Sequence, residues 1–205
     1  MRIIGGKFKG KTILPPQGYK ARPTTDFAKE GLFNILNNEY DMEGLQVLDL
    51  FGGTGAISYE FASRGASMVY CVEMLPLHAN FIKSQAAKFG MRNLTVVRHN
   101  VFEFLEICHE KFDIIFADPP YALEGLAAIP DKVFARDILH PGAYLILEHP
   151  EEFNFEAHPY FVKERKYGNV HFSFFEMPEL SGPKRRERSI EPETICIEAP
   201  KETRR

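Results

Sequence analysis

The sequence predicts an α/β fold in which helices cover a mostly parallel sheet of seven strands. The first observation is that apolar runs typical of buried strands alternate with helical segments from residue 45 onward. The second is a pair of apolar runs joined by Gly168-Asn169, which indicates a hairpin and hence an antiparallel end to the sheet. A chain of 205 residues, 44% of them hydrophobic, is long enough for one such domain and a small extension.

The N-terminal segment is predicted to form a small hairpin and a helix that precede the sheet. Residues 2–14 combine glycine turns with apolar and lysine residues, a pattern typical of a short β-hairpin. A helix is expected over residues 26–38, because Thr24 or Thr25 can serve as its N-cap and the apolar residues after it fall on one face. We therefore assign residues 1–40 to an N-terminal extension of the main domain.

Strands and helices are then expected in alternation. The strands are 47–51, 68–73, 94–99, 112–118 and 144–148, and the helices are 56–64, 76–89, 100–107 and 124–139. Pro76 and Gly90 mark the start and the end of the second of these helices. With the hairpin of 160–167 and 170–176, these elements form a domain over residues 41–178. Residues 179–205 are charged and lack periodicity, so we expect a flexible tail.

Charge is distributed unevenly along the chain. The net charge is −3, but residues 1–29 carry +6 and residues 182–205 carry +2, which leaves −11 on the segment between them. A basic N-terminal end on an acidic body predicts that this end contacts a polyanion such as a nucleic acid. The alternative is that a charged edge hairpin only prevents aggregation.

Several classes of protein are disfavoured by the composition. The sequence contains neither a signal-peptide pattern nor an apolar run of membrane-spanning length, so we expect a cytoplasmic protein that does not bind membranes. Three widely spaced cysteines, Cys71, Cys108 and Cys196, fit free thiols better than disulfides or a zinc site. The histidines lack metal-ligand spacing, so no metal is expected, and we expect a monomer.

Polar or glycine-rich features follow four successive strands. In open α/β sheets, ligands bind beyond the carboxyl ends of the strands, near the point where strand order reverses. We therefore expect these residues to form one binding site. They are Asp49, Phe51, Gly52, Gly53 and Gly55 after the first strand, Glu73 after the second, Asn100 after the third, and Asp118-Pro119-Pro120-Tyr121 after the fourth.

The charges near the glycine-rich loop indicate which ligand binds there. Asp49 is unfavourable beside a pyrophosphate, and Ser58 stands where a dinucleotide-binding loop usually has its third glycine or alanine. S-adenosylmethionine carries an amino group, a sulfonium and a ribose but no phosphate, and it fits these residues better. Glu73 is placed to bind the ribose hydroxyls. Asn100 can bind the adenine, or it can serve as the N-cap of the next helix, or both.

The Asp118–Tyr121 segment has the groups needed to bind an aromatic amine. Asp118 or the Pro119 carbonyl can accept hydrogen bonds from the N–H groups and direct the nitrogen lone pair at the methyl group, and Tyr121 can stack on the base. No covalent enzyme intermediate is needed. The alternative is an ordinary exit from a strand into a turn, since Asp and Pro are common there.

The sequence of this chain resembles that of the bacterial RsmD methyltransferases, both in the predicted site residues and in several other segments. The matching segments are 1–6, Gly10, 22–26, 30–36, 47–55, 63–66 and 116–121. The resemblance covers about residues 1–178 and implies that S-adenosylmethionine donates a methyl group to the N2 amine of a guanine in 16S ribosomal RNA of the small subunit.

The resemblance also implies which residues contact the RNA. It implies that the N-terminal hairpin, with Lys7, Lys9 and Lys11, helps to hold RNA and that Arg22 and Thr24 lie near the cleft. A sixth expected RNA contact, Lys29, stands where the family more often has arginine, so a phosphate contact there would lack the forked geometry of a guanidinium.

Two other functions remain open at the level of the sequence. A DNA adenine-N6 methyltransferase would use the same Asp118–Tyr121 chemistry, but the chain has no room for a sizeable DNA-recognition domain. A non-catalytic RNA-binding factor could also have this fold. Donor binding, and methylation assays on 30S particles and on duplex DNA, separate these alternatives.

Overall fold

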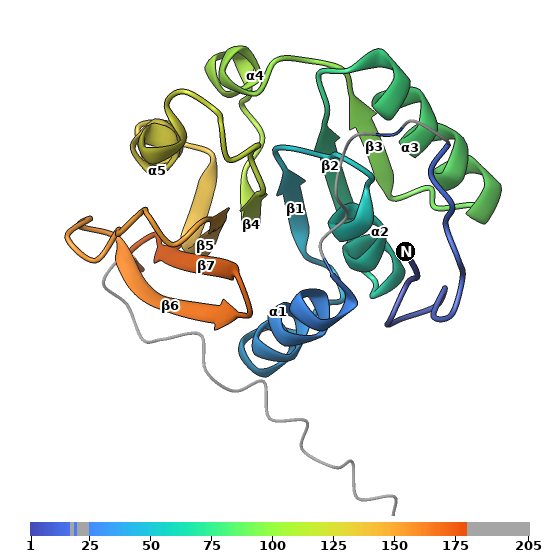
Figure 1. The fold of residues 1–205 in the computed structure, drawn as a ribbon, viewed down its shortest axis with the longest axis horizontal. Coiled ribbons are helices and arrows are strands. Elements are labelled where there is room, and N and C mark those ends of the chain that lie inside the picture. Colours follow the sequence, from blue (N-terminus) through green and yellow to red (C-terminus); the bar gives the residue numbers. More distant parts are fainter. Residues whose placement is uncertain (17–18, 20–24, 180–205) are drawn as a thin grey trace, which may run out of the picture.

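The computed structural model describes residues 1–16, 19 and 25–179, and a sheet of seven strands forms its centre (Figure 1). The strands are β1 Gln46–Asp49, β2 Met68–Val72, β3 Leu94–Val97, β4 Phe112–Ala117, β5 Leu139–His149, β6 Phe161–Tyr167 and β7 Val170–Glu176. Their order in the sheet is β3-β2-β1-β4-β5-β7-β6. The first five strands are parallel, whereas β7 runs antiparallel to both of its neighbours. The predicted sheet and its antiparallel hairpin are confirmed.

The helices divide between the two faces of the sheet. They are α1 Asp26–Glu39, α2 Ala56–Ser63, α3 Pro76–Phe89, α4 Val101–Ile107, the 3₁₀ turn η1 Leu126–Ala128 and α5 Ile129–Phe134. Val47 packs in a hydrophobic cluster with residues of α1, α2 and α3, whereas Leu48, the next residue of β1, packs in a second cluster with residues of α4 and α5. This change of face from one residue to the next is the period-2 pattern of a strand covered on both sides.

Strand order reverses between β1 and β4, because the chain moves outward to β2 and β3 and then returns to the other side of β1. The two strands pair in parallel, with Asp49 opposite Phe116. Their carboxyl ends therefore lie side by side, at the kind of position where open α/β sheets bind their ligands.

Two predicted elements differ from the structure. The helix expected over 124–139 is only η1 followed by α5, because Leu139 already pairs with Phe112 as the first residue of β5. The hairpin expected over 2–14 turns back on itself, and backbone hydrogen bonds join its arms, for example from the Ile3 amide to the Lys11 carbonyl at 3.0 Å, but it forms only an isolated bridge, between Arg2 and Thr12, in place of two strands. Other amides of the segment bond to α2, as described below. The division into a basic extension, a catalytic domain and a tail stays a prediction.

The helix cap and the tail complete the comparison with the sequence. Thr25 is the N-cap of α1, and its Oγ1 accepts a hydrogen bond from the Ala28 amide at 3.2 Å. Thr24, Arg22 and the tail beyond residue 179 lie outside the described residues. Within the described part, every helix is too short or too polar to cross a membrane.

Candidate active site

Three carboxylates meet at the carboxyl edge of the sheet, where β1, β4 and β5 end. Asp49 ends β1 opposite Phe116, and Ala117 pairs with Leu147, so that Asp118 and Glu148 are the next residues of their strands. Each acid also lies two positions after a strand residue in the cluster beneath α1–α3, and these residues are Val47, Phe116 and Ile146. The acids therefore share one face of three adjacent strands, which are spaced about 4.8 Å apart.

Burial raises the pKa of all three acids. The carboxylate of Asp49 is 1% exposed, and its pKa rises to about 6, mainly through burial. Burial raises the pKa of Glu148 to about 7, although a hydrogen bond from the Tyr121 hydroxyl acts in the opposite direction. Burial, and then the charges of Glu148 and Asp49, raise the pKa of Asp118 well above its usual range. The edge is thus a desolvated site of negative charge that favours a cation or a donor of N–H bonds.

Two oxygens at this edge lack a hydrogen-bond partner among the described residues. They are Asp49 Oδ1 and Glu148 Oε2. The other oxygen of Asp49, Oδ2, accepts a bond of 2.6 Å from Ser58 Oγ. Buried carboxylate oxygens are normally bonded, so an orphan at a strand end points to a ligand. Ser58, the residue that departs from the dinucleotide pattern, orients Asp49.

The glycine-rich loop after β1 is held in place by its neighbours. Gly53 and Gly55 have φ values of +52° and +81°, which favour glycine. The Gly53 amide donates to Glu73 Oε2 at 2.9 Å, and the Gly53 carbonyl accepts from the Tyr19 hydroxyl at 2.7 Å. A Cβ on Gly52 would overlap Cys71, so the loop lies directly against β2.

Asn100 lines a shallow hollow beyond β2 and β3, and Glu73 directly precedes another lining residue, Met74. Glu73 Oε1 accepts from the Leu75 amide at 2.7 Å, which fixes its side chain. Asn100 Oδ1 accepts from the amides of Phe102 and Glu103 at 2.9 and 3.3 Å, which confirms the N-cap interpretation. Its Nδ2 faces Met74 Sδ at 3.9 Å. The hollow has a volume of about 440 Å³ and is lined by Met74, Pro76, Arg98, His99, Asn100 and Glu103.

The residues after β4 present an open aromatic face. Pro119 is buried, whereas Pro120 is exposed and its carbonyl accepts from the Leu123 amide at 2.8 Å. Tyr121 is 48% exposed. A half-exposed tyrosine close to the partly exposed Asp118 leaves one ring face available for stacking.

Sequence reasoning missed two residues of this site. Glu148 ends the predicted strand 144–148, and an acid after the apolar run of that strand was a usable signal. Tyr19 bonds to Gly53 and stacks on His78 with ring centroids 4.0 Å apart. No local pattern distinguished Tyr19, since its partners Gly53 and His78 are more than thirty residues away in the sequence.

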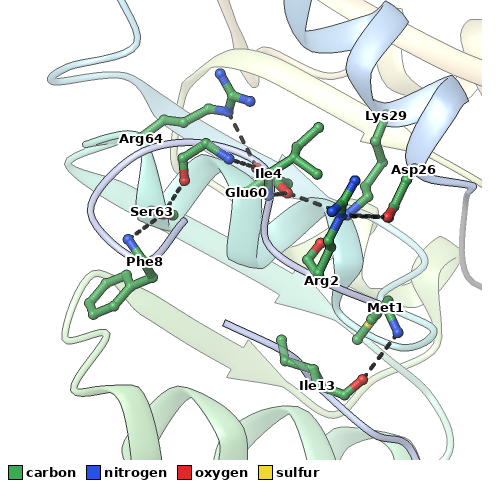
Figure 2. Close-up of polar contacts among 11 residues, drawn as sticks. Met1, Arg2, Ile4, Phe8, Ile13, Asp26, Lys29, Glu60, Ser63 and Arg64 are labelled. Carbon is green, nitrogen blue, oxygen red and sulfur yellow. Dashed lines mark hydrogen bonds and ion pairs between the residues drawn. The ribbon is translucent and has the colours of Figure 1, made fainter. Parts of the chain in front are cut away.

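Figure 2 shows a second polar cluster, which joins the N-terminal segment to α2. Glu60 is fully buried on α2, and its carboxylate accepts bonds from the amides of Ile4 and Gly5 at 2.6 and 3.2 Å. It also pairs with Lys29 Nζ at 3.3 Å and with Arg64 Nε at 3.4 Å. One buried acid therefore fixes the N-terminal backbone, α1 and α2 together.

Lys29 does not face solvent, and this corrects a prediction. It is 1% exposed, and its ammonium donates to the Arg2 carbonyl at 2.6 Å and lies within 3.5 Å of both Glu60 and Asp26. The Lys29 ammonium has three N–H donors, and these three acceptors are enough to satisfy all of them. The expectation that Lys29 contacts an RNA phosphate is wrong, because a buried, fully paired ammonium is not available to one.

Lys7, Lys9 and Lys11 are exposed on the loop of this N-terminal segment. The loop is anchored by Ser63, whose carbonyl accepts from the Lys7 amide at 2.7 Å and whose Oγ accepts from the Phe8 amide at 2.9 Å. The backbone is thus held while the three ammonium groups remain in solvent.

Comparison with known proteins agrees with this geometry. A family model described as "Conserved hypothetical protein 95" matches residues 1–176. The Ribosomal RNA small subunit methyltransferase D of Buchnera aphidicola (strain Bp) is 30% identical over 179 residues, 85% of this chain and 91% of that protein. The protein of the same name from Escherichia coli K12 is 35% identical over 121 residues, 59% of this chain and 60% of its own. A solved hypothetical protein of Thermus thermophilus matches with a TM-score of 0.77 and 30% identity, covering 86% of this chain and 99% of that one.

The strand order and the acidic edge beside a glycine-rich loop define a Rossmann-like, S-adenosylmethionine-dependent methyltransferase. The match over residues 1–176 then places the chain in a particular family: it belongs to the family described as Conserved hypothetical protein 95. The resemblance to the RsmD methyltransferases is confirmed by the two relatives of that name.

The raised pKa of Glu148 leads to a prediction for the stability of the protein. A carboxyl whose pKa is higher in the folded than in the unfolded chain binds its proton more tightly when folded, so stability falls as pH rises between the two values. For Glu148 this interval runs from 4.5 to about 7. We expect the E148Q variant to be more stable than the parent by about 2–3 kcal/mol at pH 8 and by much less at pH 4.5. Urea unfolding at both pH values measures this, and an equal difference at the two would contradict it.

Proposed function

We propose that this protein transfers a methyl group from S-adenosylmethionine to the exocyclic N2 of a guanine in 16S ribosomal RNA. The observation that carries the proposal is the convergence of Asp49, the glycine-rich loop and Asp118 at one edge of the sheet, where β1 and β4 lie side by side. A donor site and an amine pocket on a shared edge support direct transfer between them. The names of the relatives support the small-subunit RNA as substrate.

The donor site fits S-adenosylmethionine on its own chemistry. Asp49 has a buried, unpaired oxygen that can bind a cationic group. The loop that follows begins with Phe51, which is half-buried, and then has no bulky side chain, since it contains Gly52, Gly53 and Gly55. Glu73 would hold the ribose hydroxyls, and the Asn100 amide would bind the adenine in the hollow beside Met74. S-adenosylmethionine, when it is bound, supplies an electrophilic methyl group on its sulfonium.

The amine pocket orients the acceptor. Asp118, with the Pro119 carbonyl, would accept hydrogen bonds from the target amine and so hold its lone pair toward the methyl group. Asp118 would then take up the proton that the methylated nitrogen releases, and its raised pKa suits that role. Tyr121 would stack on the base, which must be unpaired or flipped out to reach the pocket.

The N-terminal loop would provide the RNA contact. We expect that changing Lys7, Lys9 and Lys11 together to glutamine weakens RNA binding and reduces the slope of log affinity against log salt by about 2–3, since each phosphate contact contributes roughly one unit. Filter binding at a series of salt concentrations measures the slope. A charge-matched control triple variant changes Lys111, which directly precedes β4, Lys132 on α5 and Lys166 on β6. An unchanged slope in the first triple variant would make the charge of the loop incidental.

The proposed function is tested by mass mapping of ribosomal RNA from cells that lack this protein. We expect one guanine of 16S RNA to lose an N2-methyl group and to regain it when purified protein and S-adenosylmethionine are added to 30S particles. Methylation of duplex DNA instead would favour an adenine-N6 enzyme. Calorimetry without measurable affinity for S-adenosylmethionine would favour a non-catalytic RNA-binding factor.

A further inference from the structure

Glu148 is a buried acid that the proposed transfer of the methyl group does not use. Its residue is 5% exposed, and its Oε2 lacks a partner among the described residues. Holding a carboxylate in this state costs stability, since desolvation disfavours its charge. Such a group at the carboxyl edge of a sheet calls for a ligand that donates hydrogen bonds.

The position of Glu148 relative to the amine pocket limits what that ligand is. Ala117 pairs with Leu147, so Glu148 is the neighbour of Asp118 on the next strand, about 4.8 Å across the sheet, and both side chains are on the same face. The charge of Glu148 raises the pKa of Asp118, and the Tyr121 hydroxyl lowers the pKa of Glu148, so the three groups act on one another. Glu148 thus belongs to the side of the edge where Asp118 and Tyr121 lie, and the donor loop lies beyond Asp49.

In the part of the chain that the structure describes, the side chains of histidine, cysteine, aspartate and glutamate form no group of three that could hold a metal ion. We consider an organic donor of hydrogen bonds as the partner for the unpaired oxygen.

On its Watson–Crick edge, a purine ring held at Asp118 by its amine presents one ring nitrogen beside that amine. In guanine this is N1–H, a donor, and N3 on the other side of the amine is an acceptor. In adenine the Watson–Crick neighbour is the bare N1, an acceptor. An ionised carboxylate attracts the N1–H of guanine and repels the bare N1 of adenine. A site with a buried hydrogen-bonding group also rejects strongly any analogue that leaves this group unpaired.

We propose that Glu148 determines the base specificity of the acceptor site, and that its unpaired Oε2 accepts a hydrogen bond from N1–H of the target guanine while Asp118 holds the N2 amine. This inference rests on the proposed function. In this arrangement two acids on adjacent strands, Asp118 and Glu148, accept hydrogen bonds from two adjacent donors on one edge of the base, the N2 amine and N1–H. Glu148 makes no contact with the reacting methyl group, so its role is to select and position the base.

The test compares guanine with 2-aminopurine, which keeps the amine at C2 but has an unprotonated N1. Small-subunit particles are reconstituted with 16S RNA that carries either base at the nucleotide mapped above. We expect the parent protein to prefer guanine by about 100-fold or more in kcat/KM. In E148Q the amide can donate to a bare N1, so the preference should fall to about tenfold or less, through slower guanine and faster 2-aminopurine methylation.

Controls separate recognition from a structural role. E151Q makes the same chemical change three residues later at an exposed position and should keep the preference of the parent. Calorimetry of S-adenosylmethionine and the melting temperature should be unchanged or improved in E148Q, because an isosteric neutral group replaces an unpaired buried charge. Lost donor affinity in E148Q would place the carboxylate in the donor site and overturn the inference.

The outcomes also separate this inference from the proposed function. A parent protein that methylates guanine while E148Q shows the same preference overturns the inference alone. A parent protein that does not methylate the guanine-bearing particle overturns the proposed function, and the inference falls with it.

Discussion

Asp118→Ala should abolish methyl transfer, with kcat/KM lowered about 10³-fold or more, while affinity for S-adenosylmethionine stays within about threefold of the parent. The carboxylate lies at the end of β4, where its pKa is raised by burial and by Glu148, and it is proposed to hold the target amine and accept its proton. The donor loop follows β1, so the two sites are supported by different strands. Single-turnover methylation and calorimetry on one preparation measure both quantities.

Two further variants define what the carboxylate at residue 118 contributes. Asp118→Asn keeps the shape and one acceptor oxygen, and we expect it to retain more activity than alanine. Glu124→Ala removes an exposed acid six residues downstream and should leave turnover unchanged. Full activity in Asp118→Ala would remove this residue from the mechanism and leave only the Pro119 carbonyl to orient the amine.

Glu60→Ala should lower the free energy of unfolding by about 3–5 kcal/mol. The carboxylate is fully buried and bonds to the amides of Ile4 and Gly5, to Lys29 and to Arg64 (Figure 2). Its removal leaves the Lys29 ammonium in the interior with less charge to balance it, and two amides without their acceptor. Urea unfolding at pH 7 measures the loss.

A double-mutant cycle tests whether the loss arises from the buried pair. Combining Glu60→Ala with Lys29→Met removes both charges, so the double variant should be more stable than the sum of the single effects predicts, by about 1–3 kcal/mol. Glu30→Ala, an exposed acid on the same α1 helix as Lys29, should change stability by less than about 0.5 kcal/mol. Additive effects in the cycle would show that the amide contacts alone explain the loss.

The sheet and its functional edge were predictable because both depend on local signals. Apolar runs, Pro76 and Gly90 mark the elements, and the order of strand-end features along the chain already suggested a shared edge for Asp49 and Asp118. The burial of Lys29 was not predictable, because only the position of α2 in the folded protein shows that Glu60 lies beside Lys29. A lysine four residues into a helix looks the same in sequence whether it meets solvent or a buried acid.

The N-terminal hairpin shows a similar limit. Glycines and lysines over residues 2–14 predicted strands, but only part of the ladder forms, because the amides of Ile4, Gly5 and Phe8 bond to Glu60 and Ser63 and not across the hairpin. Hydrogen-bond partners more than fifty residues away are not visible in local periodicity. The turn at this segment was nevertheless correct, with Gly6 and Gly10 at φ values of +69° and +85°.

The anchoring of the lysine loop by Ser63 has a consequence for the speed of recognition. A segment that is already ordered loses little conformational entropy when it meets its partner, so its ammonium groups act as a rigid template from the first encounter. Gly6 packs so closely on the Ser63 carbonyl that a methyl group there would force the loop off α2. Under the proposed function, Gly6→Ala, which adds no charge and removes none, should therefore slow the binding of RNA by loosening the loop.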